Sequence, residues 1–455
     1  MTTSASTSRA GRLSFPRKLG YSLGSSGANF VWQMVSFYLV FFYTDVFGIP
    51  AATVGTILLA ARIFDALNDP VMGHIADQTR TRWGRFRPYL LFGPIPFVVI
   101  FVLTFSTPAF SITGKVVYAA VTYLCLGMAY TAMTVPHSAL MASVTQDTDE
   151  RSSLASLTMI AIYSTILVVA AGTMPLVNSF SSQQTGFTVT ASIYGVMAVG
   201  LYMICFKSTR ELQACNLKRH RFRDGLRLVA QNKPLLVLLI AVCITQAAND
   251  IRTTAAIFFL KYNIGNEPFY PLFMAIMILS MIAGASFAPA LGRRLGSKRN
   301  LYVIGTLVVI PANTVVLFTP YHDLTRIVVS LAVSSVGIGI TYVMIRSMFA
   351  DMVEYGEWKT GMRGEGIILS TYGVANKLGY AIGGSLAAFL LAGTGYVPNV
   401  AQSQQVQTLI LYMVALFPII AGILAIGVLH FYKVDAKCYN KILREIRERK
   451  QGQAE

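Results

Sequence analysis

The chain has 455 residues, of which 54% are hydrophobic and only 13% are charged. These values and a mean hydropathy of +0.57 are typical of a membrane protein with many spans and exclude a soluble enzyme of this length. The formal net charge of +17 comes from Lys and Arg in short runs between apolar stretches. Such runs indicate orientation by the positive-inside rule and contact with anionic lipid, and they argue against nucleic acid as a partner.

A helix needs about 20 residues to cross the hydrocarbon core of a bilayer, and the sequence offers twelve stretches of suitable length and composition. We predict them at residues 20–47, 52–77, 89–108, 114–143, 153–180, 188–207, 234–261, 268–291, 301–319, 324–352, 366–393 and 406–432. Runs of Arg and Lys follow the second, sixth and eighth stretches, whereas few follow the odd-numbered ones. This asymmetry predicts that both termini are cytoplasmic.

The longest internal polar stretch, residues 207–234, divides the chain into two halves that resemble each other. The basic segment 74–93 after the second stretch has a counterpart at 290–305 after the eighth. We therefore predict an all-α membrane protein with twelve transmembrane helices in two six-helix bundles, whose substrate site lies between the halves near the midplane. The predicted parts are a cytoplasmic N-terminal lead (1–18), an N-terminal bundle (19–207), a cytoplasmic linker (208–233), a C-terminal bundle (234–432) and a cytoplasmic tail (433–455).

The second stretch carries two carboxylates inside an apolar segment. Asp65 and Asp69 stand four residues apart with Asn68 between them, so one helical face collects their oxygen atoms. A carboxylate near the bilayer centre costs about 3 kcal/mol on insertion scales, so such residues usually mark an ion or substrate path. An alternative is that Arg62 neutralises Asp65 within a packing network, although this does not account for Asp69.

Four motifs, in order along the chain, carry a resemblance to a known family. They are Asp65–Pro70, Arg80–Pro88, Tyr130–Pro136 and Asp351–Lys359. From Leu19 to about Tyr439 the chain resembles the melibiose carrier and its relatives, the glycoside-pentoside-hexuronide:cation symporter family of the major facilitator superfamily. The resemblance implies the major facilitator superfamily fold and the coupled transport of a sugar with a cation.

The resemblance assigns the coupling cation to Asp65, Asp69 and Thr131, with Asn68 placed to assist. Oxygen ligands suit a small, hard cation, and two neighbouring carboxylates repel each other unless a cation or a proton lies between them. Sodium and proton both remain open, and if the ion is sodium, Asp65 and Asp69 are its metal ligands. No cofactor other than the coupling ion is expected.

The sugar site departs from that of the melibiose carrier. Where the carrier has carboxylates on its first and fourth helices, this chain has Asn29 and Thr134, which disfavours a melibiose-like galactoside. Arg252 and Arg346 add cations inside apolar segments, and Lys377 matches the family's helix-eleven lysine near cation and sugar. Guanidinium groups bind carboxylate and sulfonate in a forked geometry, so an anionic glycoside, such as a glucuronide or a sulfonated sugar, fits this set.

Both arginines have a structural alternative. Arg252 could pair with Asp250 or with another span, and Arg346 could belong to a gate. The remaining candidates follow from residue type, since aromatic rings pack against the C–H faces of sugars and amides bind their hydroxyls. They are Trp32, Gln33, Asn249, Tyr342, Tyr372 and Asn376.

Charged residues at the ends of several stretches match the family's inner ion-pair network and the superfamily's loop signature. Such pairs tie the two halves together when the cavity faces outward and separate when it faces inward. The gate candidates are Asp77, Arg85, Arg151, Asp351, Glu354, Glu357, Arg363 and Glu365. A solvated charged loop is the alternative for any one of them.

We therefore predict a secondary active transporter of the bacterial cytoplasmic (inner) membrane that couples glycoside uptake to sodium or protons by alternating access. Its partners are the glycoside, the cation and membrane lipid, and it works as a monomer. The alternative is a cation-coupled carrier of lysolipid type from the same superfamily, which the polar residues of the sugar site disfavour. No HExxH, GxSxG or P-loop signature lies in a loop, so an enzyme is not expected.

Overall fold

The computed structural model of the chain describes residues 13–144, 148–211, 228–295, 297–361, 365–434 and 436–451. Within these ranges the regular elements are helices, apart from one isolated β-bridge between Thr81 and Gly84. The chain divides into two compact units, Met1–Leu217 (unit 1) and Lys218–Glu455 (unit 2). The boundary falls in the linker predicted at 208–233, most of which lies outside the described residues.

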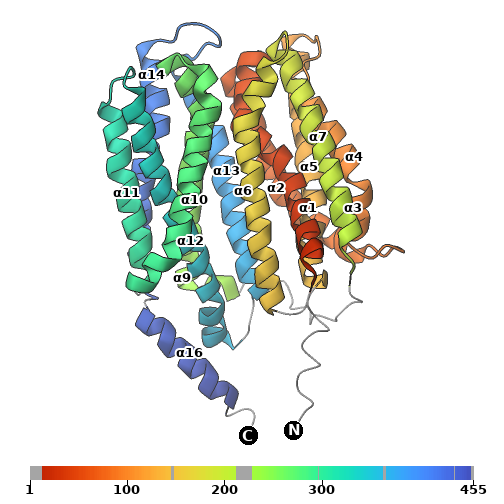
Figure 1. Cartoon of the computed structure of the whole chain (residues 1–455), viewed down its shortest axis with the longest axis vertical. Coiled ribbons are helices and arrows are strands. Elements are labelled where there is room, and N and C mark those ends of the chain that lie inside the picture. Colours follow the sequence, from red (N-terminus) through yellow and green to blue (C-terminus); the bar gives the residue numbers. More distant parts are fainter. Residues whose placement is uncertain are drawn as a thin grey trace. The chain divides into compact units, whose positions relative to one another are not determined.

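The described part of unit 1 contains seven α-helices and one π-helical turn that continues the first of them (Figure 1). They are α1 (Phe15–Phe41), η1 (Phe42–Val46), α2 (Ala51–Gln78), α3 (Arg87–Phe92), α4 (Pro94–Thr104), α5 (Ile112–Val144), α6 (Thr148–Asn178) and α7 (Gln183–Ser208). The stretch predicted at 89–108 is divided between α3 and α4 at Gly93. Pro94 follows this glycine and has no N–H to donate, which accounts for the interruption.

Helix α1 is largely buried within unit 1, and its glycines let neighbouring helices approach closely. A Cβ added at Gly24 would lie 2.6 Å from His137 Nε2 and 2.8 Å from Cys205 Sγ, so the close approach depends on glycine here. The His137 ring stacks on Tyr21 with centroids 4.5 Å apart, and its Nε2 lies 3.1 Å from the Tyr21 carbonyl oxygen. His137 is therefore a buried packing residue of unit 1.

The described part of unit 2 contains the remaining helices (Figure 1), and π-helical turns continue two of them. They are α9 (Lys233–Phe258), η2 (Phe259–Ile264), η3 (Glu267–Phe269), α10 (Tyr270–Leu295), α11 (Lys298–Phe318), α12 (Leu324–Thr360), α13 (Glu365–Gly393), α14 (Gln404–Leu411), η4 (Tyr412–Leu416), α15 (Phe417–Leu429) and α16 (Ala436–Gln451). The helix α12 continues eight residues beyond its predicted end at residue 352 and stops at Gly361, whose φ of +73° favours glycine.

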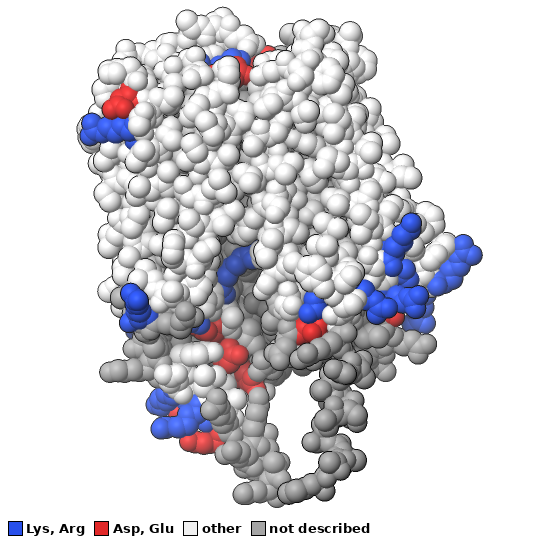
Figure 2. Space-filling model, in the orientation of Figure 1, with Lys and Arg blue, Asp and Glu red and all other residues white. Residues whose placement is uncertain are grey.

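Among the described residues, nine helical segments are long and apolar enough to cross a membrane. On the face shown in Figure 2, uncharged residues cover most of the surface, and Lys and Arg gather mainly toward one end. In lipid the backbone N–H and C=O groups must bond within the segment, which favours helices for apolar stretches of this length. The described residues therefore form a helical structure with nine candidate membrane spans.

The tail predicted at 433–455 contains the amphipathic helix α16, which lies at the end of unit 2 where α12 ends (Figure 1). Its apolar side chains Ile442 and Ile446 are buried. The Trp358 indole at the end of α12 donates a hydrogen bond of 2.6 Å to Glu445 Oε2. Arg449 Nη1 donates to the Trp358 carbonyl oxygen over 2.8 Å. These contacts fix α16 to the end of α12.

The contact between α16 and α12 is expected to weaken in acid. The indole hydrogen bond and the neighbouring basic side chains lower the pKa of Glu445 below its ordinary value of 4.5. A carboxylate with a lowered pKa stabilises the docked helix above its ordinary pKa, and this contribution is lost as the pH falls through the lowered value. Hydrogen-exchange protection of residues 436–451 should therefore be constant from pH 7 to 5 and fall below pH 4.5.

Trp358→Phe provides the control for this titration, because it removes the indole donor and keeps an aromatic ring. In this variant protection of α16 should already be reduced at pH 7 and should change less on acidification. An acid transition of the same size in the parent and in Trp358→Phe would rule out the Trp358–Glu445 bond as its cause.

Candidate functional site

The predicted cation site lies in unit 1, where α2 faces α5. Asp65 is half-buried and lines a small pocket with side chains of α1 and α5, among them Trp32, Tyr123 and Tyr130. Its carboxylate lies directly against Gly127 of α5, so that a Cβ added at this glycine would overlap Asp65 Oδ1. Because Gly127 has no side chain, the Asp65 carboxylate can pack directly against α5.

Two further candidates for the cation lie on the same pair of helices. Thr131 follows Gly127 by one turn of α5 and is only 1% exposed. Asn68 follows Asp65 by three residues on α2 and is half-buried. The structure thus places oxygen-bearing side chains of both helices around the contact between Asp65 and α5, whereas the side chain of Asp69 lies outside the described residues.

Gly127→Ala is expected to weaken cation binding selectively. The new methyl group would clash with Asp65 Oδ1 and displace the carboxylate from α5. Because cation affinity depends on the number and placement of oxygen ligands, the affinity for the coupling cation should fall about tenfold or more, corresponding to about 1.4 kcal/mol. The measurement is cation-dependent protection of the purified protein against thermal unfolding.

Gly200→Ala is the matched control, because Gly200 lies within α7 of the same unit and a Cβ there meets no atom within 4 Å. This variant should keep the parent's cation affinity. Equal cation affinities for Gly127→Ala and Gly200→Ala would contradict a cation role for the contact between Asp65 and α5.

The sugar candidates of unit 1 form two groups in the structure. Asn29 and Gln33 lie one turn apart on α1, and Gln33 Nε2 donates to Asn29 Oδ1 over 3.4 Å. Trp32 stacks on Tyr130 with ring centroids 4.7 Å apart, beside Asp65 in the same small pocket. The Thr134 hydroxyl donates to the Tyr130 carbonyl oxygen over 2.9 Å, so its proton is used within α5.

The larger pocket lies inside unit 2 and contains four of the predicted sugar residues. It encloses about 640 Å³ between atoms, part of it open to solvent. Its walls come from α9, α11, α12, α13 and α15. The lining residues are Val242, Thr245, Gln246, Ala248, Asn249, Arg252, Tyr302, Thr306, Val309, Ile338, Thr341, Tyr342, Ile345, Tyr372, Pro418, Ala421 and Gly422.

Arg252 is the cation of this pocket. It is 7% exposed, and its guanidinium donates to hydroxyls and a carbonyl of α12: Ser334 Oγ at 3.2 Å, Ser335 Oγ at 3.3 Å and the Leu331 oxygen at 3.3 Å. Asp250, two residues earlier on α9, lies against Gly383 of α13 and is not among these acceptors. The acceptors are neutral, so they orient the guanidinium without cancelling its charge.

Arg346, Tyr372, Asn376 and Lys377 form a second polar group on α12 and α13. Arg346 is exposed, and its Nε donates to the Tyr372 hydroxyl over 3.3 Å. Its guanidinium carbon also lies 5.3 Å from the Tyr372 ring centroid. Asn376 Nδ2 donates to the Tyr372 carbonyl oxygen over 2.8 Å, and Lys377, the next residue, is half-buried. Tyr372 therefore joins this group to the pocket that it also lines.

Gln246 is not among the residues predicted from the sequence, and it lies on the pocket wall one turn before Asn249. Gln246 is 2% exposed, and its Oε1 accepts a 2.9 Å hydrogen bond from the Tyr342 hydroxyl. Its buried Nε2 has no hydrogen-bond partner among the described residues. The available signal was periodic: residues 246, 249 and 252 recur every three positions and share one face of the helix.

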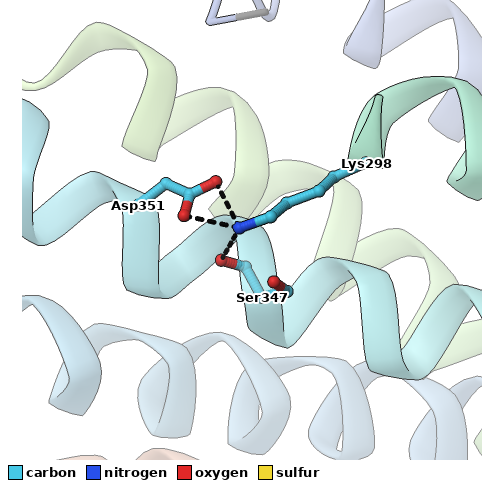
Figure 3. Close-up of polar contacts among 3 residues, drawn as sticks. All are labelled: Lys298, Ser347 and Asp351. Atoms are coloured by element: carbon cyan, nitrogen blue, oxygen red, sulfur yellow. Dashed lines mark hydrogen bonds and ion pairs between the residues drawn. The ribbon is translucent and has the colours of Figure 1, made fainter. Parts of the chain in front are cut away.

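The gate candidate Asp351 pairs with Lys298 of the same unit. Lys298 Nζ lies 2.6 and 2.8 Å from its two carboxylate oxygens and 3.5 Å from the Ser347 carbonyl oxygen (Figure 3). Both charges belong to unit 2, so any partner of Asp351 in the other half has to displace or share Lys298. Glu354 is half-buried and Glu357 is buried. The side chains of Asp77, Arg151, Arg363 and Glu365 lie outside the described residues.

Arg85 lies in a loop that a residue missed by the sequence analysis holds in place. Glu211, beyond the end of α7, accepts the backbone N–H groups of Arg85, Phe86 and Arg87 over 2.7, 2.8 and 2.9 Å. Gly84 precedes them with φ +106°, and a Cβ there would lie 2.5 Å from the Glu211 carboxylate. A carboxylate on backbone N–H groups at the start of α3 is favourably placed, so Glu211 fixes the loop after α2.

The family described as MFS/sugar transport protein matches residues 20–436. The chain belongs to this family. Within the major facilitator superfamily it is a member of the glycoside-pentoside-hexuronide:cation symporter family, as the four motifs indicate. It is a membrane transporter and not an enzyme.

The chain is similar to other symporters and carriers over almost its whole length. The chain is 36% identical over 446 residues to the uncharacterized symporter YnaJ of Bacillus subtilis, with 96% of each chain covered. It is 33% identical over 449 residues to the glucuronide carrier protein homolog of Escherichia coli, with 97% of each covered. Among solved structures, the nucleoside transporter NupG matches with a TM-score of 0.64 at 12% identity, over 92% of this chain and 99% of NupG. This last likeness shows the fold alone.

Proposed function

We propose that the protein takes up a glycoside together with a sodium ion or a proton by alternating access. In this proposal twelve spans form two six-helix bundles in the inner membrane, both termini are cytoplasmic, and a monomer is the working unit. The symporter YnaJ and the glucuronide carrier homolog support coupled glycoside transport as the function.

The position of Asp65 is the observation that supports coupling to a cation. A carboxylate on an apolar helix is held against α5 by a glycine contact, with the buried Thr131 one turn away. Such an arrangement changes its charge when a cation arrives, because the cation neutralises a carboxylate in a medium of low dielectric constant. We assign the cation to Asp65, Asn68, Asp69 and Thr131.

The substrate class follows from the cations near the sugar candidates. Arg252 is buried with neutral hydrogen-bond acceptors, and Arg346 is exposed beside Tyr372. A guanidinium in such surroundings favours an anionic ligand. We therefore propose that an acidic glycoside, such as a glucuronide or a sulfonated sugar, is preferred over its neutral counterpart.

Transport into proteoliposomes tests both parts of the proposal. We expect 4-nitrophenyl β-glucuronide to accumulate inside when an inward sodium or proton gradient is imposed, and to equilibrate without accumulation when both gradients are absent. The neutral 4-nitrophenyl β-glucoside serves as the comparison. Accumulation that is the same with and without the sodium and proton gradients would refute coupling. Faster uptake of the glucoside than of the glucuronide would refute the acidic substrate class.

A further inference from the structure

The pocket inside unit 2 presents one polar face of α9. Gln246, Asn249 and Arg252 lie three residues apart along this helix and line the pocket together. At a rise of about 1.5 Å per residue, their backbone positions span about 9 Å along the helix axis. The walls from α11, α12 and α15 add apolar side chains, among them Val309, Ile338 and Ile345. A polar strip facing apolar walls is typical of sites for small molecules with one polar edge.

The Gln246 side chain is held from two sides. Gly379 of α13 packs against its stem, since a Cβ added there would lie 2.6 Å from Gln246 Cβ and 2.9 Å from its Cγ. On the other side the Tyr342 hydroxyl donates to Oε1 over 2.9 Å. The amide is thus fixed in position before any ligand arrives, which reduces the loss of side-chain entropy on binding.

One end of this fixed amide lacks a partner. Gln246 is 2% exposed, and Nε2 is buried without a hydrogen bond to the described residues. Buried polar groups in folded proteins nearly always have partners, and an exception calls for an explanation such as a ligand. An acceptor oxygen on a molecule in the pocket would provide the missing partner for Nε2.

The charge of the pocket limits what that molecule can be. Arg252, six residues further along α9, is 7% exposed, and its guanidinium donates to Ser334, Ser335 and the Leu331 oxygen. Each of these acceptors is neutral. A ligand with several oxygen acceptors and a negative charge would therefore complement the strip from Gln246 to Arg252.

We propose that Gln246 is a specificity-determining residue, and that its Nε2–H donates to an acceptor oxygen of an acidic glycoside whose polar edge enters the pocket of unit 2. The inference rests on the proposed function, which supplies the substrate class. The inference adds two details to that function. The polar edge of the sugar lies along α9 inside unit 2, and Gln246 Nε2 is the donor that recognises it.

Equilibrium binding tests the proposal in the purified full-length protein. The ligands are 4-nitrophenyl β-glucuronide and 4-nitrophenyl β-glucoside, each titrated with and without saturating sodium at two pH values. Gln246→Leu should raise the Kd for the glucuronide at least tenfold. Gln246→Glu keeps the shape of the side chain but replaces the donor by an anionic acceptor, so the ratio of the two Kd values should move toward the glucoside.

Gln407→Leu and Gln407→Glu are the matched controls. Gln407 is a partly buried glutamine of unit 2 that donates to the Tyr262 carbonyl oxygen and does not line the pocket. These variants should bind both ligands as the parent does. A purely structural role of Gln246 would raise both Kd values by the same factor, and an unchanged Kd ratio in Gln246→Glu would overturn the proposal.

The design separates this inference from the function on which it rests. If the parent binds the glucuronide with cation dependence and the Gln246 variants bind it equally well, the inference is wrong and the proposed function stands. If the parent binds neither glycoside, the proposed function is wrong and the inference is overturned with it. Cation dependence should persist in the Gln246 variants, because the assigned cation residues lie in unit 1.

Discussion

Asp65→Asn is expected to abolish cation-driven accumulation of the glycoside. The amide keeps the size of the side chain but removes the charge that would be neutralised by the cation at α5. Without that charge, cation binding and sugar binding should no longer depend on each other. Coupled ligands typically raise each other's affinity about 5- to 150-fold, and this increase should disappear. Glycoside binding in the absence of cation should remain measurable, because the sugar candidates are other residues.

The measurement is the Kd for the glycoside with and without the coupling cation, together with accumulation in proteoliposomes. Asp45→Asn is the matched control, since Asp45 is a buried carboxylate of unit 1 outside the assigned cation site and accepts a 2.7 Å hydrogen bond from Thr44. It should keep the parent's coupling. Unchanged cation dependence in Asp65→Asn would remove the basis for the proposed site.

Lys298→Met is expected to destabilise unit 2. The substitution leaves the Asp351 side chain, which is 9% exposed, without the ammonium that lies 2.6 Å away (Figure 3). A buried pair broken on one side costs about 3–5 kcal/mol. The Lys298 side chain is 41% exposed, so water screens part of the interaction and we expect about 1–3 kcal/mol. The measurement is the unfolding midpoint of the purified protein in detergent.

Two further variants separate the ion pair from general packing. Lys298→Arg should retain most of the stability, because a guanidinium can reach the same carboxylate. The double variant Lys298→Met with Asp351→Leu should recover part of the loss, because it no longer leaves a buried charge unpaired. A double variant that is less stable than Lys298→Met would show that the pair is not the source of the effect.

The helices could be predicted from sequence because lipid forces apolar backbone into internally bonded segments. The predicted stretch 324–352 became Leu324–Thr360, since no proline interrupts the segment before Gly361, whose positive φ ends the helix. The tail helix α16 was missed because its pattern is amphipathic and short of apolar residues. Its signals were the pairs Lys441–Glu445 and Arg444–Glu448 at the i,i+4 spacing.

The candidate site was only partly predictable. Charge inside an apolar stretch singled out Asp65 and Arg252, because such residues are rare in lipid. The contact between Asp65 and Gly127 depends on how α2 and α5 are rotated against each other, which no local pattern specifies. Gln246 carries no charge and resembles any polar residue on a helix, and its unpartnered amide becomes visible only in three dimensions.

The tryptophans of the chain mark three separate regions. The sequence contains only three, Trp32, Trp83 and Trp358. Trp32 stacks on Tyr130 beside Asp65, Trp83 lies under the Arg82 guanidinium at 4.0 Å in the loop after α2, and Trp358 bonds Glu445 of α16. Intrinsic fluorescence of the three single Trp→Phe variants can therefore assign a spectral change to the carboxylate pocket, the basic loop or the docked tail, without any attached label.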